Sequence, residues 1–306
     1  MGLTLRQVKY FVATAELGQV SQAAAQLAIS QSAVTTAIRE LEDALGVRLF
    51  LRSAQGMELT EHGRGFLERA YTLLAAADDA MRLPKGDTQV SGTLSVAATY
   101  TVIGYFLPHH LARLAQLYPD LKINLYELNR EAIEEGIISN RYDLGLVLTS
   151  NLINPELAAE TFISSPRRLW VTANHPLLKE PTVAFAQVAR EPYIMLTVDE
   201  AAQTSLRYWA PTGLQPSIRL RTSSVEAVRS MVANGTGVAI LSDMVYRPWS
   251  LEGRRIETVV MKDPIPAMNV GLAWKNGSEF SPAMALFRRY FRQVYIEPQG
   301  GAQARR

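Results

Sequence analysis

The 306-residue sequence predicts an α/β protein built from two structurally different parts. Apolar residues recur at helical spacing in the N-terminal part, whereas strand-like runs alternate with helical patterns from residue 93 onward. Between them, a long helical pattern over 60–83 has an apolar residue at every third or fourth position. We therefore expect a helical head, a long helix, and an α/β region with enough length for two small lobes.

Composition and charge limit the classes of protein that fit. The chain is 48% hydrophobic and 20% charged, which is ordinary for a globular protein. It has no cysteine, so disulfides, thiolate metal sites and a cysteine nucleophile are excluded. We expect a cytoplasmic protein because neither a signal-peptide core nor a membrane-length apolar run occurs. The net charge is only +2, and residues 1–60 balance five basic against five acidic side chains, so charge alone does not indicate nucleic acid.

The first two helices are expected to be short. Thr4 and Gln7 have the spacing of a capping box at the start of the first helix, and Gly18 suits its end. Ser21 is expected to cap a second helix rich in alanine, whose small side chains allow another helix to cross closely.

The third helix is expected to begin after Ser30 and to end at Gly46, and it has two faces. The inward face is an apolar stripe of Val34, Ile38, Leu41 and Leu45. The outer face has hydrogen-bonding groups and one cation, which can meet base edges and phosphates. The candidate DNA-contacting residues here are Ser30, Gln31, Ser32, Thr35, Thr36 and Arg39.

A hairpin is expected after the third helix. Two strand-like runs, 48–52 and 57–60, flank a turn that contains Gly56. This hairpin would form a wing beside the third helix, with Arg52 near its tip reaching a phosphate or the minor groove. A generic three-helix bundle remains the alternative, because helical periodicity does not specify function.

These residues resemble the N-terminal domain of LysR-type transcriptional regulators, over about sixty residues. The resemblance lies in the ordered positions Leu5, Arg6, Phe11, Ala15, Gly18, Ser21, Ala23, Ala24, Ser30 to Thr35, Ile38, Leu41, Glu42, Leu45, Gly46, Leu49, Phe50, Arg52, Leu59, Thr60 and Gly63. It implies a winged helix-turn-helix DNA-binding domain over 1–59. The family usually has Ser and then Arg where this chain has Thr35 and Thr36. Loss of that Arg removes a phosphate or guanine contact, so we expect an unusual operator preference.

The long helix is expected to start after Thr60, which would cap it, and to stop at 84–86. A four-three apolar pattern predicts a dimerisation seam over 60–84, with a core helix of a single domain as the alternative. The resemblance favours dimerisation, followed by a hinge at 85–92. The seam residues are Gly63, Leu67, Ala70, Leu74, Ala77 and Met81.

The region 93–297 resembles the family's effector domain in segments such as Tyr142 to Gly145 and Gly235 to Leu241. The resemblance implies a two-lobed fold like that of periplasmic binding proteins, with lobe I at 93–162 and 267–297 and lobe II at 163–266. The family commonly has Pro where Ser242 stands, so this turn is expected to differ. We expect a disordered tail at 298–306. The expected strands are 94–98, 123–128, 144–149, 169–173, 193–196, 218–222, 238–241, 256–261 and 269–274.

Hydroxyl groups follow the ends of several of these strands. Ligands of open α/β sheets bind outside the carboxyl ends of strands, where hydroxyls and free N–H groups favour a small anion such as a carboxylate. The resemblance aligns Thr101 with the family's effector-contacting hydroxyl, and Tyr100 could stack on an aromatic effector or fill a wall. Helix capping remains the alternative role for each hydroxyl. The effector candidates are Thr99, Tyr100, Thr101, Thr149, Thr197, Thr222 and Ser223.

No catalytic pattern accompanies this organisation. His109 and His110 are adjacent and would diverge on a helix, and no zinc-protease, phosphate-loop or nucleophile-elbow motif occurs. We expect no enzymatic activity, cofactor or metal. This disfavours a metabolic enzyme, while the N-terminal head and the missing export signal disfavour a solute-binding protein for transport.

The partners expected from this reasoning are promoter DNA, a small-molecule effector held between the lobes, RNA polymerase, and further copies of the chain. No membrane partner is expected. Dimer and tetramer, and activation and repression, remain open.

Overall fold

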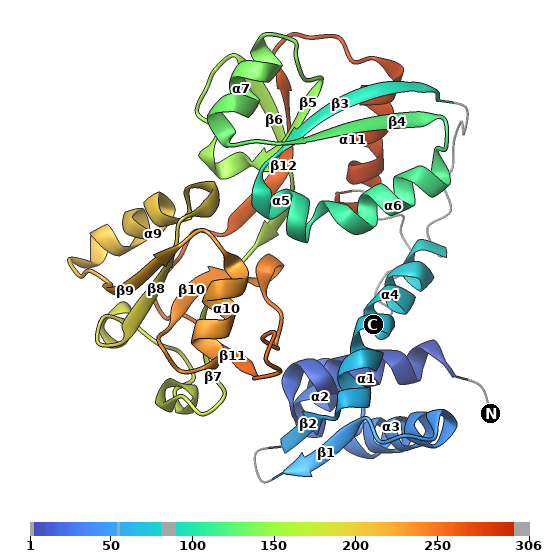
Figure 1. Ribbon diagram of the computed structural model, residues 1–306, viewed down its shortest axis with the longest axis vertical. Coiled ribbons are helices and arrows are strands. Elements are labelled where there is room, and N and C mark those ends of the chain that lie inside the picture. Colours follow the sequence, from blue (N-terminus) through green and yellow to red (C-terminus); the bar gives the residue numbers. More distant parts are fainter. Residues whose placement is uncertain (1–2, 54–55, 81–89, 297–306) are drawn as a thin grey trace, which may run out of the picture. The chain divides into compact units, whose positions relative to one another are not determined.

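The computed structural model describes residues 3–53, 56–80 and 90–296, which fall into two compact units, Met1–Gly86 and Asp87–Arg306 (Figure 1). The expected helix stop at 84–86, most of the expected hinge, and the tail at 298–306 lie outside the described residues. Among the helices described, none combines the length and the apolarity that crossing a lipid bilayer requires.

Unit 1 consists of helices and one hairpin, as the sequence predicts. Its caps follow the expected chemistry, because Thr4 and Gln7 form the capping box and Gly18 ends the first helix with a φ of 67°. The second helix differs from expectation, since it starts one residue before Ser21 and its N-terminus has no side-chain cap. The elements are α1 (Leu5–Leu17), α2 (Val20–Gln26), α3 (Gln31–Leu45), β1 (Phe50–Ser53), β2 (Gly56–Leu59) and α4 (Glu61–Ala80).

A small aromatic core joins α1 to the hairpin and to α4. The ring of Phe11 lies 5.1 Å from that of Phe50 and 4.9 Å from that of Phe66, and Phe11 has no exposed surface. Full burial of a side chain of this size contributes roughly 1.5–3 kcal/mol. Because the three rings come from α1, β1 and α4, they fix the hairpin and the start of α4 to the helical head.

A buried carboxylate connects the end of α3 to the first strand of the hairpin. Glu42 is 6% exposed, and its Oε1 accepts hydrogen bonds from the backbone N–H groups of Leu49 (2.7 Å) and Phe50 (3.1 Å). Its Oε2 accepts one from Arg48 at 2.8 Å, and this bond raises the pKa of Arg48. Buried main-chain donors are costly when unpaired, so Glu42 sets where β1 leaves the head.

Thr60 precedes helix α4 and caps it, as predicted, because its hydroxyl accepts from the Gly63 N–H at 2.9 Å. A side chain on Gly63 would place its Cβ 2.1 Å from the carbonyl oxygen of Leu49, so this position needs glycine. Of the predicted seam, Leu67 and Ala70 are buried inside unit 1 at 5% and 1% exposure.

The later positions of the predicted seam are less buried than Leu67 and Ala70. Leu74 and Ala77 are only half-buried within the single chain, and Met81 lies outside the described residues. The first part of the heptad pattern therefore belongs to the core of the head.

Lobe I of unit 2 is built on a five-stranded sheet of order β4-β3-β5-β12-β6. Strands β3, β4 and β5 are parallel, whereas β12 pairs antiparallel with both β5 and β6. Helices α5, α6 and α11 cover one face of this sheet and α7 packs on the other (Figure 1). Its elements are β3 (Gly92–Ala98), α5 (Tyr100–Tyr105), α6 (Leu107–Leu117), β4 (Leu121–Glu127), α7 (Arg130–Ile138), β5 (Leu144–Leu148), β6 (Leu157–Ser165), β12 (Met268–Lys275) and α11 (Pro282–Tyr295).

Lobe II contains the antiparallel strands β10-β7-β11 and the parallel pair β8-β9. A single parallel bridge between Tyr193 and Val238 joins the two sheets. One core cluster lies under α8 and α9 around Phe185 and Trp209, and another lies under α10 around Trp170. The elements are β7 (Arg167–Thr172), α8 (Phe185–Val188), β8 (Pro192–Leu196), α9 (Ala201–Trp209), β9 (Ser217–Thr222), α10 (Val225–Ala233), β10 (Ala239–Ser242) and β11 (Ile256–Val259).

Every strand predicted in this region is present, but the sheets are mixed rather than parallel, and β6 was not predicted. Strand β6 is half-exposed along most of its length, so it lacks a clear apolar alternation. The chain returns from lobe II to lobe I as β12. This strand enters the sheet from the edge that faces lobe II, and it pairs antiparallel with β5.

A pair of serines joins the two lobes at the crossover. The Ser242 hydroxyl, at the end of β10, donates to the hydroxyl oxygen of Ser165, at the end of β6, at 2.7 Å. The Met244 N–H also reaches the Ser165 oxygen at 3.0 Å. Both serines are buried, so the departure from Pro at position 242 provides a donor for a bond between the lobes.

We predict that Glu42→Met destabilises unit 1 by roughly 2 kcal/mol or more, because two buried backbone N–H groups lose their acceptor. All four tryptophans, Trp170, Trp209, Trp249 and Trp274, lie in unit 2. Urea denaturation followed by far-ultraviolet circular dichroism should therefore show an earlier loss of helix, while tryptophan fluorescence should keep its midpoint.

The matched control is Asp43→Asn on the same helix turn, since the Asp43 carboxylate is 71% exposed and 4.0 Å from Arg39. It should leave both transitions within about 0.5 kcal/mol of the parent. A Glu42→Met variant that unfolds with the parent's dichroism midpoint would contradict the assigned role of this carboxylate.

Candidate functional site

The outer face of α3 is exposed, and its inner face is anchored in the core of unit 1. Val34 has no exposed surface, and Ile38 is 4% exposed. Leu45, which was expected to complete the inward stripe, is 40% exposed, because the last turn of α3 extends past the core. Of the six candidate residues here, all are exposed except the half-buried Thr35: Ser30, Gln31, Ser32, Thr35, Thr36 and Arg39.

The start of α3 presents polar groups without a nearby acid. Ser30 caps the helix by accepting from the Ala33 N–H at 3.2 Å, and its hydroxyl lies 3.0 Å from that of Ser32. The Thr35 hydroxyl donates to the main-chain carbonyl of Gln31 at 2.9 Å, and Gln31 itself is exposed. The first turn contains no acidic residue, so the positive end of the helix dipole is uncompensated there.

Charge on this face comes from one guanidinium. Arg39 is 79% exposed and lies 4.0 Å from the Asp43 carboxylate, a loose pair that is worth little in water. Glu40 is held by the Gln7 amide at 3.0 Å on the side of α1.

The expected wing is present as the β1–β2 hairpin. Arg52 stands opposite Met57 in its register, one position before the end of β1. The side chain of Arg52 and residues 54–55 lie outside the part of the structure that is described.

In unit 2, a cavity of about 490 Å³ lies between the two lobes. Four of the predicted effector residues meet at this cleft: Thr99, Tyr100 and Thr197 line the cavity, and Thr101 lines an adjoining space of about 40 Å³. Tyr100 is half-buried and packs against the α10 core of lobe II.

The other three predicted effector residues line neither of these spaces. The Thr149 hydroxyl lies 2.7 Å from that of Thr161, and both belong to lobe I. The Thr222 hydroxyl accepts from the Ser224 N–H at 3.1 Å, as a turn-capping residue does, and Ser223 is exposed. Thr222 therefore has the capping role that was the alternative for each candidate hydroxyl.

A carboxylate of the chain itself occupies the position at which the sequence predicts an anion. The Oδ2 of Asp199 accepts from the Thr101 N–H at 2.6 Å, so lobe II supplies an acid to the start of α5 in lobe I. Asp199 and Glu200 both have left-handed backbones, with φ of 49° and 61°. Such conformations cost about 1–2 kcal/mol in residues with a side chain, and here they turn the Asp199 carboxylate toward lobe I.

Two further polar contacts hold the lobes together. Arg130 of lobe I donates to Glu200 of lobe II at 2.6 Å and to Glu134 at 2.6 Å. Although burial disfavours its charge, these hydrogen bonds raise the pKa of Arg130 above its ordinary value. Tyr105 of α5 donates to Glu226 of α10 at 3.0 Å, and its burial together with this acid raises the pKa of Tyr105 to about 12.

The charges around this cleft are mainly negative. Glu127, Glu131, Asp199 and Glu200 line it together with a single cation, Arg130. An anion that enters the cleft must therefore displace Asp199 or bind beside it.

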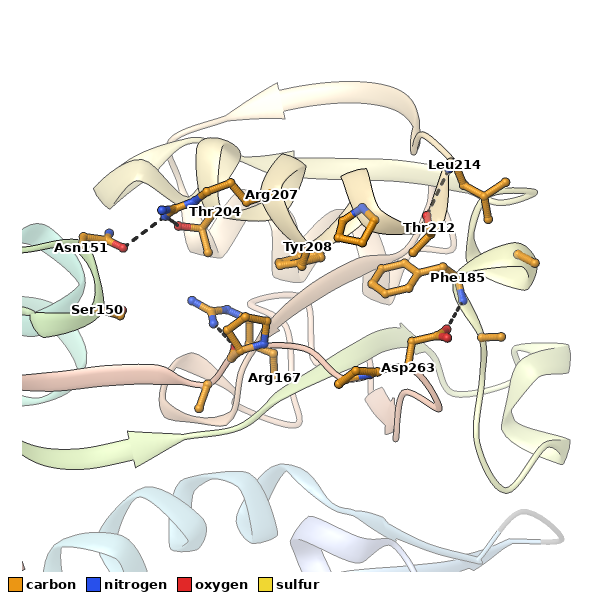
Figure 2. Close-up of a pocket in the computed structure, with 16 residues that line it drawn as sticks. Ser150, Asn151, Arg167, Phe185, Thr204, Arg207, Tyr208, Thr212, Leu214 and Asp263 are labelled. Carbon is orange, nitrogen blue, oxygen red and sulfur yellow. Dashed lines mark hydrogen bonds between the residues drawn. The ribbon is translucent and has the colours of Figure 1, made fainter.

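A larger cavity, of about 810 Å³, lies beside α9 (Figure 2). Helix α9 contributes Arg207 and Tyr208 from one side, and Arg167 faces them from the start of β7. Sequence reasoning did not select these residues, because arginine and tyrosine here fall in no recognisable motif. In the described residues, no group of three or more histidine, aspartate or glutamate side chains is arranged to hold a metal ion.

Both units match known sequence families. Residues 5–64 match the profile of the bacterial regulatory helix-turn-helix protein, lysR family, and residues 87–295 match the profile of the LysR substrate binding domain. The RuBisCO operon transcriptional regulator of Allochromatium vinosum is 28% identical over 294 residues, covering 95% of this chain and 96% of that protein. OxyR of Escherichia coli, a DNA-binding transcriptional dual regulator, is 28% identical over 282 residues, covering 90% of each chain.

Solved structures agree in fold. HinK of Pseudomonas aeruginosa, a LysR family transcriptional regulator, superposes with a TM-score of 0.62 at 27% identity, covering 95% of this chain and 98% of HinK. Full-length BenM superposes with a TM-score of 0.58 at 22% identity, covering 97% of this chain and all of BenM, and this likeness shows the fold alone.

We predict that Asp199→Gly loosens the contact between the lobes. Glycine keeps the left-handed backbone without strain but removes the acceptor of the Thr101 N–H. Since a hydrogen bond to a charged group is worth about 1.5–3 kcal/mol, the Thr101 amide should exchange with solvent roughly tenfold faster or more. Hydrogen exchange read at residues 99–103 measures this.

Glu127→Gln is the matched control, because Glu127 lines the same cavity and is exposed. It should leave the exchange of the Thr101 amide unchanged. Equal exchange in the parent and in Asp199→Gly would show that this carboxylate does not hold the lobes.

Proposed function

Because this chain belongs to the LysR family of transcriptional regulators, we propose that it binds promoter DNA through α3 and that a small molecule held between the lobes of unit 2 modulates this binding. The observation that carries the proposal is the exposed polar face of α3, backed by the buried residues Val34 and Ile38. The family regulates transcription and does not consist of enzymes. Since its partner is promoter DNA, we place the protein in the cytoplasm.

Helix α3 has the chemistry of a recognition helix. A recognition helix points its N-terminal residues at base edges in the major groove. Gln31 is suited to an adenine edge, and the hydroxyls of Ser32 and Thr36 can meet bases or phosphates. Arg39 would contact a phosphate, and Arg52 of the wing would reach the neighbouring backbone or minor groove. Thr36, where the family usually has Arg, lowers the number of charged contacts.

Two heads are needed to read an interrupted palindrome. Half-sites recognised by such dimers lie one helical turn of DNA apart, about 34–36 Å, or multiples of it. We propose that the dimer contact involves Leu74 and Ala77 in the second half of α4, and Met81 next in the sequence pattern, because Leu67 and Ala70 are already buried inside the head. A tetramer and contact with RNA polymerase are compatible with this arrangement.

Effector control requires a ligand that prefers one arrangement of the lobes. Three polar contacts cross the cleft, from Thr101 to Asp199, from Arg130 to Glu200 and from Tyr105 to Glu226. We propose that an effector bound at Thr99, Tyr100, Thr101 and Thr197 changes this set of contacts, and through it the spacing of the heads. An anionic effector would displace the Asp199 carboxylate from the Thr101 amide.

We predict that Arg39→Gln weakens DNA binding and lowers its salt dependence. Removal of one phosphate contact should reduce the slope of log K against log salt concentration by about 0.9. Fluorescence anisotropy of the full chain with labelled DNA duplexes of varied sequence, titrated over a range of salt concentrations, measures both quantities.

Lys9→Gln is the matched control, because Lys9 is an exposed cation of the same unit that belongs to α1 and not to α3. It should leave the slope unchanged. Absent or salt-independent binding by the parent chain at low salt would refute the proposed function. An equal loss of slope in both variants would refute the assignment of the DNA contact to α3.

A further inference from the structure

The α9 cavity holds two guanidinium groups that have no carboxylate partner among the described residues. Arg167, at the start of β7, donates to the Pro266 carbonyl and forms no ion pair in the described part of the chain. Arg207, on α9, is hydrogen bonded to the neutral side chains of Thr204 (3.1 Å) and Asn151 (3.5 Å). Arg130, which lines the cleft between the lobes, is by contrast neutralised by three glutamates.

The unpaired state of Arg167 is energetically unfavourable. Burial lowers the pKa of the Arg167 guanidinium, and the nearby charge of Arg207 acts in the same direction. A charge taken from water needs a partner of opposite sign to offset its desolvation. Two cations that face one cavity, one of them half-buried, therefore create a preference for an anion between them.

The rest of the cavity wall is suited to an apolar body. Figure 2 shows the rings of Tyr208 and Phe185 on the wall beyond the two arginines. Both rings are buried in the lobe II core and lie 5.9 Å apart. The rest of the apolar lining is contributed by Ala184, Pro211, Leu214, Pro264, Pro266 and Ala267.

The one acid in the wall is already engaged. Asp263 accepts from the Phe185 N–H at 2.8 Å, at the end of the cavity away from Asn151 (Figure 2). It holds the start of α8 in place and forms no ion pair with either arginine. The cavity is therefore cationic at its Asn151 end and apolar toward Phe185.

We propose that this cavity binds an amphipathic organic monoanion, a carboxylate carried on a flat apolar or aromatic body, with Arg167 and Arg207 holding the carboxylate. The guanidinium fork matches carboxylate geometry, and rings of the ligand would pack against Tyr208 and Phe185. A volume of about 810 Å³ lies in the range of pockets that enclose small organic molecules. The inference goes beyond the proposed function, because Thr99, Tyr100, Thr101 and Thr197 do not line this cavity, although the small space at Thr101 borders it through Arg167, Thr204 and Tyr208.

The position of the cavity connects it to both crossover segments. Arg167 begins β7 directly after the first crossover, and Pro266 and Ala267 precede β12 in the second. Ser150 and Asn151 of lobe I close one end. A ligand here contacts the segments whose geometry determines how the lobes are joined.

Benzoate is the probe that tests this proposal, measured by isothermal titration calorimetry with the full chain. We expect saturable binding of one benzoate per chain with a dissociation constant on the order of millimolar or tighter. Acetate, which lacks the apolar body, and benzyl alcohol, which lacks the charge, should each bind roughly tenfold more weakly or not at all. Absent benzoate binding, or benzyl alcohol binding as tightly as benzoate, would overturn the proposal.

Two variants locate the binding in the α9 cavity. Arg207→Gln changes an exposed side chain, so it should fold normally and weaken benzoate binding about tenfold or more. Arg167→Gln should do the same, with tryptophan fluorescence as the check on the fold of unit 2. The matched control, Arg219→Gln, changes an exposed arginine of β9 outside the cavity and should bind benzoate as the parent does.

Unchanged benzoate binding in Arg207→Gln would place the ligand elsewhere and overturn the assignment. Glu127→Gln, in the cleft between the lobes and outside the α9 cavity, should leave benzoate binding intact. This measurement involves no DNA, so its failure is distinguishable from a failure of the proposed DNA binding.

Discussion

Both units depend on one kind of interaction. In it, a carboxylate accepts hydrogen bonds from main-chain N–H groups of another segment. Glu42 binds the amides that start β1, and Asp143 binds the Ser95 amide in β3 at 2.7 Å. Asp199 binds the Thr101 amide across the lobes, and Asp263 binds the Phe185 amide that starts α8. In each case a charged acceptor binds a main-chain donor outside its own helix or loop.

This use of acids explains how a chain with a net charge of only +2 leaves cations available at particular places. Glu42 is directed inward and Glu40 is held by Gln7, so the outer face of α3 carries Arg39 without a strong counter-charge. In lobe II, Asp263 is bound to the backbone, so Arg167 and Arg207 remain without a carboxylate. The distribution of charge matters more here than its sum.

The two lobes are held by a few polar contacts and a short crossover rather than by a continuous core. Each lobe has its own apolar clusters, and α5 of lobe I adds Tyr100 and Tyr105 to a cluster of lobe II. A few charge-assisted hydrogen bonds, each worth about 1.5–3 kcal/mol, are of the size that a small ligand can outweigh. Such a balance is what ligand-dependent rearrangement requires, since a ligand shifts an equilibrium only by its difference in affinity for two states.

Features that depend on residues close together in the chain could be predicted from the sequence. The capping box at Thr4, the cap at Ser30, the positions of the strands and the two faces of α3 follow from spacings of two to four residues, and the structure has them. The sequence also indicated that Thr99, after β3, and Thr197, after β8, lie at one cleft, because ligand sites of α/β folds gather at the carboxyl ends of strands.

Features that join residues far apart in the chain became visible in the folded structure. It placed Leu67 and Ala70 in the core of the head, turned Asp199 toward α5, and brought Arg167, Phe185 and Arg207 around one cavity. A heptad pattern is the same whether the helix packs on its own domain or on a second copy. The left-handed backbone at Asp199 and the missing partner of Arg167 arise from contacts between segments far apart in the chain, and local residue patterns carry no record of such contacts.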